Sequence, residues 1–247
     1  MNFIGIIPAR FQSTRFPGKP LVLLGEKPII QWVYENVKKA LAVVYVATDD
    51  ERIFQAVEAF GGKAIYTSVN HQSGTDRCAE AAQKLSDHLN FDVVINIQGD
   101  EPFIRIEQIK GLMDCFSSPE TEIATLIKPI TDANEITNIN RPKVVINKNQ
   151  EAMYFSRSPI PFVRDSKSDE WIDQNTFYSH IGMYAYRFDI LKQLTRLPVG
   201  ILEKAESLEQ LRWLENGYRI KTAQTTFDNI GIDTPEDLRQ AEKLLKY

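Results

Sequence analysis

The sequence contains little cysteine, no long apolar run and no excess of positive charge, and each absence excludes a class of protein. Its two cysteines, Cys78 and Cys115, form no Cys-x-x-Cys motif, which argues against a disulfide framework or a cysteine-bound zinc ion. No run of about 18 apolar residues is present, so no segment is expected to span a membrane. With 29 Lys and Arg against 33 Asp and Glu, the chain lacks the basic footprint of a nucleic-acid-binding protein. The cysteine usage favours a reducing, cytoplasmic setting.

The composition is that of an ordinary globular protein, with 43% hydrophobic and 25% charged residues over 247 positions. It excludes intrinsic disorder, which requires low apolar content and a large net charge. The length lies within the range that one large domain can fill, so we expect a single domain over 1–247. Residues 1–8 lack the basic start and cleavage site of a signal peptide, and they are expected to form a strand.

The first part of the chain alternates between short apolar runs and segments with helical spacing of apolar residues. This β-α-β order predicts a parallel sheet with right-handed crossovers and helices on both faces. In such sheets, ligands bind at the carboxyl ends of the strands. The expected strands are 3–7, 43–47, 63–66 and 92–97, and the expected helices between them are 29–37, 51–60 and 74–89.

After residue 120 the pattern changes to strand-like segments with few helices between them, which predicts an inserted mixed or antiparallel sheet region at about 122–190. The last helix is expected to begin at Thr234-Pro235, a hydroxyl N-cap followed by proline in the first turn. The other expected elements are strands at 122–130, 144–147, 152–157 and 178–186 and helices at 187–197 and 202–216.

The loop after the first strand gathers three positive charges, Arg10, Arg15 and Lys19, and two hydroxyls, Ser13 and Thr14. Guanidinium groups bind phosphate oxygens in bidentate fashion and lysine adds a point charge, so this loop predicts a triphosphate site. It matches neither a Walker A motif nor a dinucleotide fingerprint. The structural alternative is a solvated basic turn.

Two carboxylates end strand-like segments elsewhere. Asp100 follows the strand at 92–97 in a Gly-Asp-Glu-Pro turn, and Asp233 follows the strand-like residues that precede the last helix. A carboxylate facing a phosphate loop is repelled by the substrate unless a cation lies between them, and Mg²⁺ binds one or two carboxylates together with phosphate oxygens. The pair therefore predicts a magnesium site, although either residue alone could be a turn or cap residue.

Two further segments carry candidate binding residues. The polar loop at 71–77 leads into a helix, and its amides with Arg77 could grip a base or ribose, although its hydroxyls could equally serve only as helix caps. In the strand at 178–186, alternation puts His180, Tyr184 and Tyr186 on one face. A lone histidine is more often structural than ligand-binding, so a sugar-binding role for His180 needs further support.

Together these segments resemble the 3-deoxy-manno-octulosonate cytidylyltransferases, also called CMP-Kdo synthetases. The resemblance spans almost the whole chain in the order of that family, and the combination is far more specific than any one motif. Two regions depart from the family pattern: 138–145 matches only in part, and the polar loop at 166–175 is unlike that of familiar members. The matching blocks are 8–21, 46–49, 71–77, 98–102, 154–157, 180–184, 208–212 and 231–237.

The resemblance implies a Rossmann-like nucleotidyltransferase fold, a homodimer, and a Mg²⁺-dependent reaction in which CTP and Kdo give CMP-Kdo and diphosphate for lipopolysaccharide synthesis. The implied catalytic residues are Arg10, Lys19 and Asp100, and the implied metal ligands are Asp100 and Asp233. The implied nucleotide-binding residues are Ala9, Arg10, Ser13, Thr14, Lys19, Gly74 and Arg77. The implied sugar-binding residues are Gln98, Arg157, His180, Tyr184, Glu209 and Gln210.

Two alternatives remain at this stage. The nearer one is a cytidylyltransferase for another acid sugar, such as 8-amino-Kdo or a sialic or legionaminic acid. The other is a non-catalytic nucleotide sensor built on the same sheet. Two carboxylates beside phosphate groups argue against the sensor, because a sensor gains nothing from them.

Overall fold

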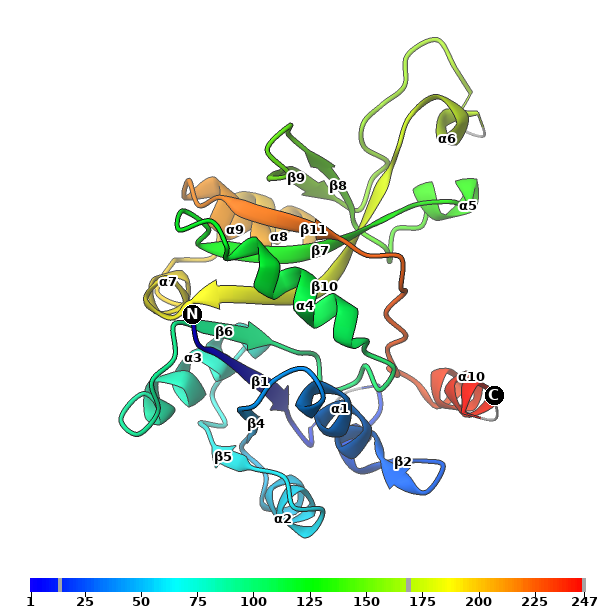
Figure 1. The fold of residues 1–247 in the computed structure, drawn as a ribbon. Helices are drawn as coiled ribbons and strands as arrows, with labels where there is room; N and C mark the ends of the chain where they lie inside the picture. Colours follow the sequence, from blue (N-terminus) through cyan, green and yellow to red (C-terminus); the bar gives the residue numbers. More distant parts are fainter. Residues whose placement is uncertain (13–14, 168–169, 246–247) are drawn as a thin grey trace. The chain divides into compact units, whose positions relative to one another are not determined.

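The computed structural model describes residues 1–12, 15–167 and 170–245 (Figure 1). The chain forms two compact units. The first unit comprises Met1–Lys110, Arg187–Thr195 and Asn229–Tyr247. The second comprises Gly111–Tyr186 and Arg196–Asp228, and it contains most of the sheet insertion expected at about 122–190. Among the described residues, no helix is long and apolar enough to cross a membrane.

The first unit contains the parallel sheet that the apolar runs predicted. Strand β1 (Phe3–Ala9) lies between β6 (Val93–Asn96) and β4 (Val44–Thr48), and β4 continues to β5 (Ala64–Tyr66), all in parallel. Apolar side chains of β1 and its neighbours are fully buried, which is why these strands read as nearly continuous apolar runs. The carboxyl ends of β1 and β6 therefore lie side by side.

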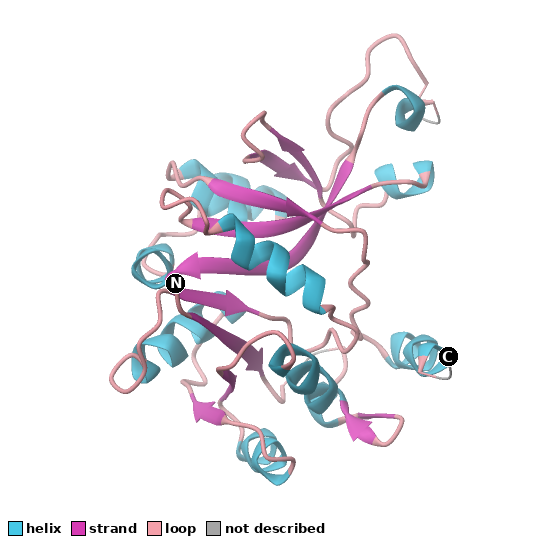
Figure 2. Cartoon of the chain, in the orientation of Figure 1, coloured by secondary structure: helices cyan, strands magenta, loops and turns pink. Residues whose placement is uncertain are grey.

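Helices alternate with these strands (Figure 2), and local side chains determine where they begin and end. Asp50, Ser73 and Thr234 each accept a backbone N–H bond at a helix N-terminus. The other short elements of this unit are the 3-10 helix η1 (Lys19–Leu21) and strands β2 (Leu23–Leu24) and β3 (Lys27–Pro28). The helices are α1 (Ile29–Lys38), α2 (Glu51–Ala59), α3 (Gly74–Leu85), α7 (Phe188–Leu194) and α10 (Pro235–Leu244), with α4 (Ile106–Cys115) at the boundary of the units.

The second unit contains a mixed sheet, as the change of pattern after residue 120 predicted. Strand β10 (Tyr178–Arg187) pairs antiparallel with β7 (Ile123–Pro129) and with β8 (Lys143–Ile146). Strand β8 pairs antiparallel with β9 (Ala152–Ser156), whereas β11 (Ile220–Gln224) lies parallel to β7. Its helices are α5 (Ala133–Ile136), α6 (Trp171–Gln174), α8 (Ile201–Glu206) and α9 (Gln210–Glu215).

Three expectations about secondary structure were wrong or incomplete. The helix expected at 202–216 is two helices, because Ser207 adopts a left-handed conformation with φ of 52° and ends α8. Strand β11 and helix α4 were not predicted. In β11, the polar residue Thr222 occupies a buried position and so interrupts the alternation of apolar residues. In α4, Gly111 weakens the helical pattern. Residues 229–232 form no strand. The backbone N–H of Ile232 donates a hydrogen bond of 2.9 Å to the carbonyl oxygen of Asp100, which ties this segment to the end of β6.

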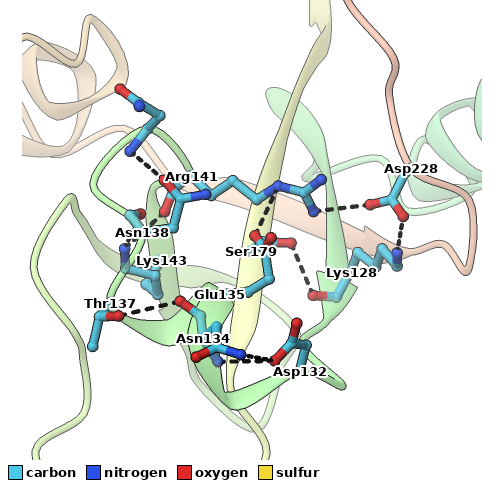
Figure 3. A network of polar contacts seen from close by, with 11 residues as sticks. Lys128, Asp132, Asn134, Glu135, Thr137, Asn138, Arg141, Lys143, Ser179 and Asp228 are labelled. Carbon is cyan, nitrogen blue, oxygen red and sulfur yellow. Dashed lines mark hydrogen bonds and ion pairs between the residues drawn. The ribbon is translucent and has the colours of Figure 1, made fainter. Parts of the chain in front are cut away.

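A polar network fixes the loop between β7 and β8 in the second unit (Figure 3). The guanidinium of Arg141 bonds Asp228 at 3.0 Å and Glu135 at 2.9 Å, and Lys128 also pairs with Asp228. Lys143 is completely buried and donates to the carbonyls of Asn138 and Arg141, each at 2.8 Å. Lysine is therefore required inside the 138–145 stretch to satisfy a tight backbone turn.

The approach of the β6 end to β1 leads to a test of the fold. A Cβ on Gly99 would lie 2.9 Å from the carbonyl oxygen of Pro8, which is backbone and has little freedom to move. Gly99→Ala should therefore lower the free energy of unfolding by about 1–3 kcal/mol in urea denaturation. Gly111→Ala is the matched control, since its Cβ would make an ordinary 3.6 Å contact in a helix where alanine is favoured. Equal unfolding midpoints for both variants would contradict this packing.

Candidate active site

A cavity of about 310 Å³ lies in the first unit at the carboxyl ends of β1 and β6. It brings together eight residues that the sequence singled out. They are Ala9, Arg10, Lys19, Gly74, Arg77, Gln98, Asp100 and Asp233. The other lining residues are Pro8, Arg15, Pro20, His71, Gln72, Ser73 and Gly99.

At one end of this cavity, two carboxylates share one ammonium group. The Lys19 Nζ lies 2.5 Å from an oxygen of Asp100 and 2.9 Å from an oxygen of Asp233. Arg15, which was named as a loop charge but not as a site residue, pairs with the other oxygen of Asp233 at 3.0 Å. The two acidic side chains predicted to converge therefore do so, around a cation supplied by the chain itself.

Asp233 is held in place from both sides of its own position in the chain. Ile232 is fully buried in an apolar cluster with Leu24 of β2, Ile29 of α1 and Ala241 of α10. Thr234 caps α10, and the Asp237 carboxylate accepts bonds from the N–H groups of Asp233 and Thr234 at 3.1 and 2.8 Å. Hydrophobic burial and a helix cap thus place this carboxylate beside Asp100.

Lys19 is placed by a turn that requires glycine. Gly18 has φ of 73°, and its N–H donates to the carbonyl of Phe11 at 2.8 Å. The Phe11 ring lies against Gly18 and under the Arg52 guanidinium, 3.3 Å from the ring centroid. This turn starts η1 and directs Lys19 back to the strand ends.

Burial and neighbouring charges raise the pKa values of two groups near the carboxylate pair, Lys19 and Glu101. Burial alone would lower the pKa of Lys19, but the carboxylates of Asp100 and Asp233 outweigh burial and raise it. Burial raises the pKa of Glu101 to about 8, and the nearby negative charge of Asp100 adds to the shift. Glu101 accepts a 2.5 Å hydrogen bond from Asn229, which Gln108 in turn holds at 2.8 Å.

The other end of the cavity is formed by the N-terminus of α3. Gly74 is its first residue, and Arg77, only 4% exposed, follows in the first turn. The Arg77 guanidinium donates to the hydroxyl of Thr67 at 2.6 Å and forms an ion pair with Asp49 at 3.1 Å. Part of its hydrogen-bonding capacity therefore holds the fold, and a contact with cytidine stays a prediction.

The basic loop is described in part. Arg10 is exposed, lines the cavity and pairs with no other residue that the structure describes, so its guanidinium is available to a ligand. Ser13 and Thr14, the two hydroxyls predicted to hold phosphate, lie outside the described residues.

Of the predicted sugar-binding residues, Gln98 lies in the first unit and the other five in the second. His180 on β10 contacts the hydroxyl of Thr125 at 3.0 Å and packs against the rings of Phe155 and Tyr184. Burial lowers the pKa of His180 to about 3. This histidine is therefore a neutral hydrogen-bonding group at physiological pH.

Tyr184 and Gln210, two other residues of the predicted sugar-binding set, are 7% and 5% exposed. The hydroxyl of Tyr184 contacts the side chain of Thr125, and the side-chain nitrogen of Gln210 has no hydrogen-bond partner among the described residues. Burial raises the pKa of the Tyr184 hydroxyl, and the charge of Glu209 adds to the shift. An unsatisfied buried polar atom is costly in a native protein, and a contact of either side chain with a sugar stays a prediction.

Arg157 has a structural role that sequence reasoning did not anticipate. Its Nε donates to the carbonyl of Glu206 at 2.7 Å, and its Nη atoms donate to the carbonyls of Ile139 and Ser207 at 2.9 and 3.3 Å. The left-handed Ser207 presents one of these carbonyls. A direct contact between Arg157 and a sugar stays a prediction.

The donor set fits a hard divalent cation completed by substrate. Among the described residues, no group of three or more His, Cys, Asp or Glu side chains is placed to hold a metal ion. Asp100 and Asp233 supply two carboxylates within reach of one point, which matches the one or two that Mg²⁺ takes beside substrate phosphates. The arrangement suits phosphate chemistry rather than a preformed metal centre.

Comparison with known proteins decides the family. A cytidylyltransferase family model matches residues 4–221. The 3-deoxy-manno-octulosonate cytidylyltransferase of Bacteroides thetaiotaomicron is 58% identical over 100% of this chain and 99% of its own length. The enzyme of that name from Phocaeicola vulgatus is 59% identical over 100% of this chain and 98% of its own. The chain belongs to the 3-deoxy-manno-octulosonate cytidylyltransferase family.

Solved structures agree with this assignment to the 3-deoxy-manno-octulosonate cytidylyltransferases. A structure of CMP:2-keto-3-deoxy-manno-octonic acid synthetase complexed with CTP has a TM-score of 0.92 and 42% identity, covering 100% of this chain and 99% of that one. A cytidylyltransferase from Leptospira borgpetersenii, 17% identical with a TM-score of 0.64, shares the fold. The Rossmann-like nucleotidyltransferase fold is confirmed.

The burial of His180 predicts a pH dependence of stability. In the unfolded chain a histidine titrates near 6.5. Below that pH the unfolded state binds a proton that folded His180 does not bind until about pH 3, so the free energy of unfolding falls as pH decreases. In His180→Gln, the free energy of unfolding should depend less steeply on pH between 7.5 and 4.5, by up to the equivalent of about one bound proton, as measured by urea denaturation at each pH. His88→Gln, at an exposed position, is the control, and equal slopes in both variants would contradict a neutral His180.

Proposed function

We propose that the chain transfers the cytidylyl group of CTP to 3-deoxy-D-manno-octulosonate, giving CMP-Kdo and diphosphate. The observation that carries this proposal is the convergence of Asp100 and Asp233 on Lys19, in a cavity that is also lined by Arg10, whose guanidinium pairs with no other described residue. A site with paired carboxylates and fixed cations suits a metal-bound triphosphate. The names of the relatives support CTP and this acid sugar as substrates.

The reaction needs no covalent enzyme intermediate. The anomeric hydroxyl of the sugar attacks the α-phosphorus in line with the departing diphosphate, and catalysis consists of positioning and charge stabilisation. Arg10 and Lys19 would bind the oxygens of the leaving group, where negative charge develops. Gly74 and the neighbouring amides at the α3 N-terminus would hold the nucleoside.

Asp100 and Asp233 would hold Mg²⁺, which when bound would neutralise phosphate charge. Lys19 now lies where it would compete with that cation, since its ammonium bonds both carboxylates. Polyphosphate oxygens offer Lys19 and Arg15 alternative anionic partners. Binding of the nucleotide would therefore free the carboxylates for the metal.

The acid sugar would be held by residues of the predicted sugar-binding set. Gln210 would gain the hydrogen bond that its side-chain nitrogen lacks among the described residues, Tyr184 would offer its hydroxyl, and neutral His180 would bond a sugar hydroxyl. Glu209, Gln98 and Arg157 complete the proposed set.

The cellular setting belongs to the same proposal. We infer an enzyme of lipopolysaccharide biosynthesis that works in the cytoplasm, which its two free cysteines suit. We also infer a homodimer. Phe162 in the second unit is 76% exposed, and a large exposed aromatic side chain favours such an interface.

The proposal is tested by measuring diphosphate release from CTP with a panel of acid sugars. Kdo should support the highest kcat/KM, above 8-amino-Kdo, sialic acid and legionaminic acid. Asp100→Asn should lose nearly all turnover at any Mg²⁺ concentration while still unfolding cooperatively, because it removes a metal ligand. Preference for another sugar would overturn the substrate assignment, and near-normal Asp100→Asn kinetics would overturn the site.

The proposed replacement of the Lys19 ammonium by a metal ion beside Asp100 and Asp233 leads to a second prediction. Lys19→Met should lower kcat by on the order of 10²–10³, as loss of an oxyanion-type donor does. In the absence of CTP, the same variant should bind Mn²⁺ more tightly than wild type in electron paramagnetic resonance titrations, because no ammonium competes. Lys27→Met is the control, since Lys27 pairs with Glu35 outside the site. Unchanged Mn²⁺ affinity in Lys19→Met would show that Lys19 does not compete for this position.

A further inference from the structure

His71 lines the cavity near the α3 N-terminus, and Glu80 holds it from the middle of that helix. The ring Nε2 of His71 contacts a carboxylate oxygen of Glu80. The two side chains are 19% and 26% exposed, so the contact is largely shielded from water. Neither residue is among the binding or catalytic residues considered so far.

The Glu80 carboxylate is itself fixed by two other partners. The oxygen that contacts His71 also accepts the N–H of Ser68 at 2.9 Å, and the second oxygen pairs with Lys84 at 2.7 Å. Lys84 donates further to the carbonyl of Tyr66 at 2.8 Å. Burial would raise the pKa of Glu80, but Lys84, the Ser68 N–H and His71 together lower it to about 2. The loop before α3 is therefore tied to that helix by a permanently charged carboxylate.

This contact determines which nitrogen of His71 remains available. An ionised carboxylate only accepts hydrogen bonds. Nε2 of His71 therefore carries a hydrogen and donates a hydrogen bond to Glu80. In the neutral ring, Nδ1 is then a bare acceptor, as in other carboxylate-oriented histidines. Nδ1 has no hydrogen-bond partner among the residues that the structure describes.

We propose that Glu80 is a positioning residue that orients His71 so that its Nδ1 accepts a hydrogen bond from the nucleoside part of the substrate. The donor is an N–H or O–H group, either the base amino group or a ribose hydroxyl. This inference rests on the proposed function, because it takes the cavity to be the CTP site. It adds a nucleotide-binding residue and its support to the basic loop and the carboxylate pair.

A double-mutant cycle on CTP binding tests the pair. Glu80→Gln and His71→Phe should each weaken CTP binding in calorimetry and raise the KM for CTP about three- to tenfold, the value of one hydrogen bond, with kcat nearly unchanged. The double variant should bind no more weakly than His71→Phe alone, since Glu80 acts through the ring. Lys84→Met is the matched control: it removes another partner of the same carboxylate but leaves the His71 contact, and its KM should stay within about twofold of wild type.

Nucleotide analogues identify the donor group. If the base amino group donates, His71→Phe should reduce the preference for CTP over UTP and leave 2′-deoxy-CTP binding as weakened as CTP binding. If the ribose 2′-hydroxyl donates, wild type and His71→Phe should bind 2′-deoxy-CTP equally well. A His71→Phe variant that binds every nucleotide like wild type would overturn the inference.

Other outcomes separate this inference from the function on which it rests. If the losses of CTP affinity in Glu80→Gln and His71→Phe multiply in the double variant, Glu80 does not act through His71. Should Glu80→Gln fail to fold, the comparison of His71→Phe with Lys84→Met still decides whether the ring binds CTP, and equal affinities would reject that role. Wild-type protein that binds no CTP would overturn the proposed function together with this inference, whereas CTP binding with an additive cycle would overturn this inference alone.

Discussion

The site depends on one electrostatic constraint: two carboxylates that would repel each other are held together by the ammonium of Lys19. Without a cation, Asp100 and Asp233 could not be packed so closely at a strand end. The chain therefore supplies the positive charge that a metal ion would supply in the proposed reaction. In that reaction, the arrival of a cation would be linked to the arrival of phosphate groups that attract Lys19 and Arg15.

Much of this site could be predicted from the sequence because the rules involved are local or topological. Apolar runs identified β1 and β6 as strands of one parallel sheet, and residues that follow such strands lie at one edge of the sheet. The polar residues following them, from Arg10 to Lys19 and at Asp100, were found on that basis. The structure adds that the two strands are neighbours. Asp233 was harder, because the segment before it is not a strand; its position comes from the burial of Ile232 and the cap at Thr234.

What the sequence could not provide was the pairing of groups through irregular backbone. The contact of His71 with Glu80 requires the loop after β5 to fold back along α3, and no periodicity encodes that course. A usable signal was nevertheless present, since Ser73 fixes the start of α3 and hence the face on which Glu80 lies. Similarly, the left-handed Ser207 divided an apparently continuous helix, and only its backbone angle explains how Arg157 finds three carbonyl partners.

The two ends of the cavity use different physics, and this explains why their residues differ in exposure. At the end proposed to bind phosphate, Arg10 and Arg15 are exposed, and in the proposed reaction they would exchange water or an internal partner for phosphate oxygens. At the end proposed to bind the nucleoside, Arg77 is buried and already bonded, and the cavity wall is set by helix α3 and the loop before it. Exposed charges would suit a group whose charge changes during reaction, whereas a fixed wall would suit a base that must be distinguished from similar bases. On the proposed function, the contact of Glu80 with the loop before α3 would therefore contribute to selectivity for the base.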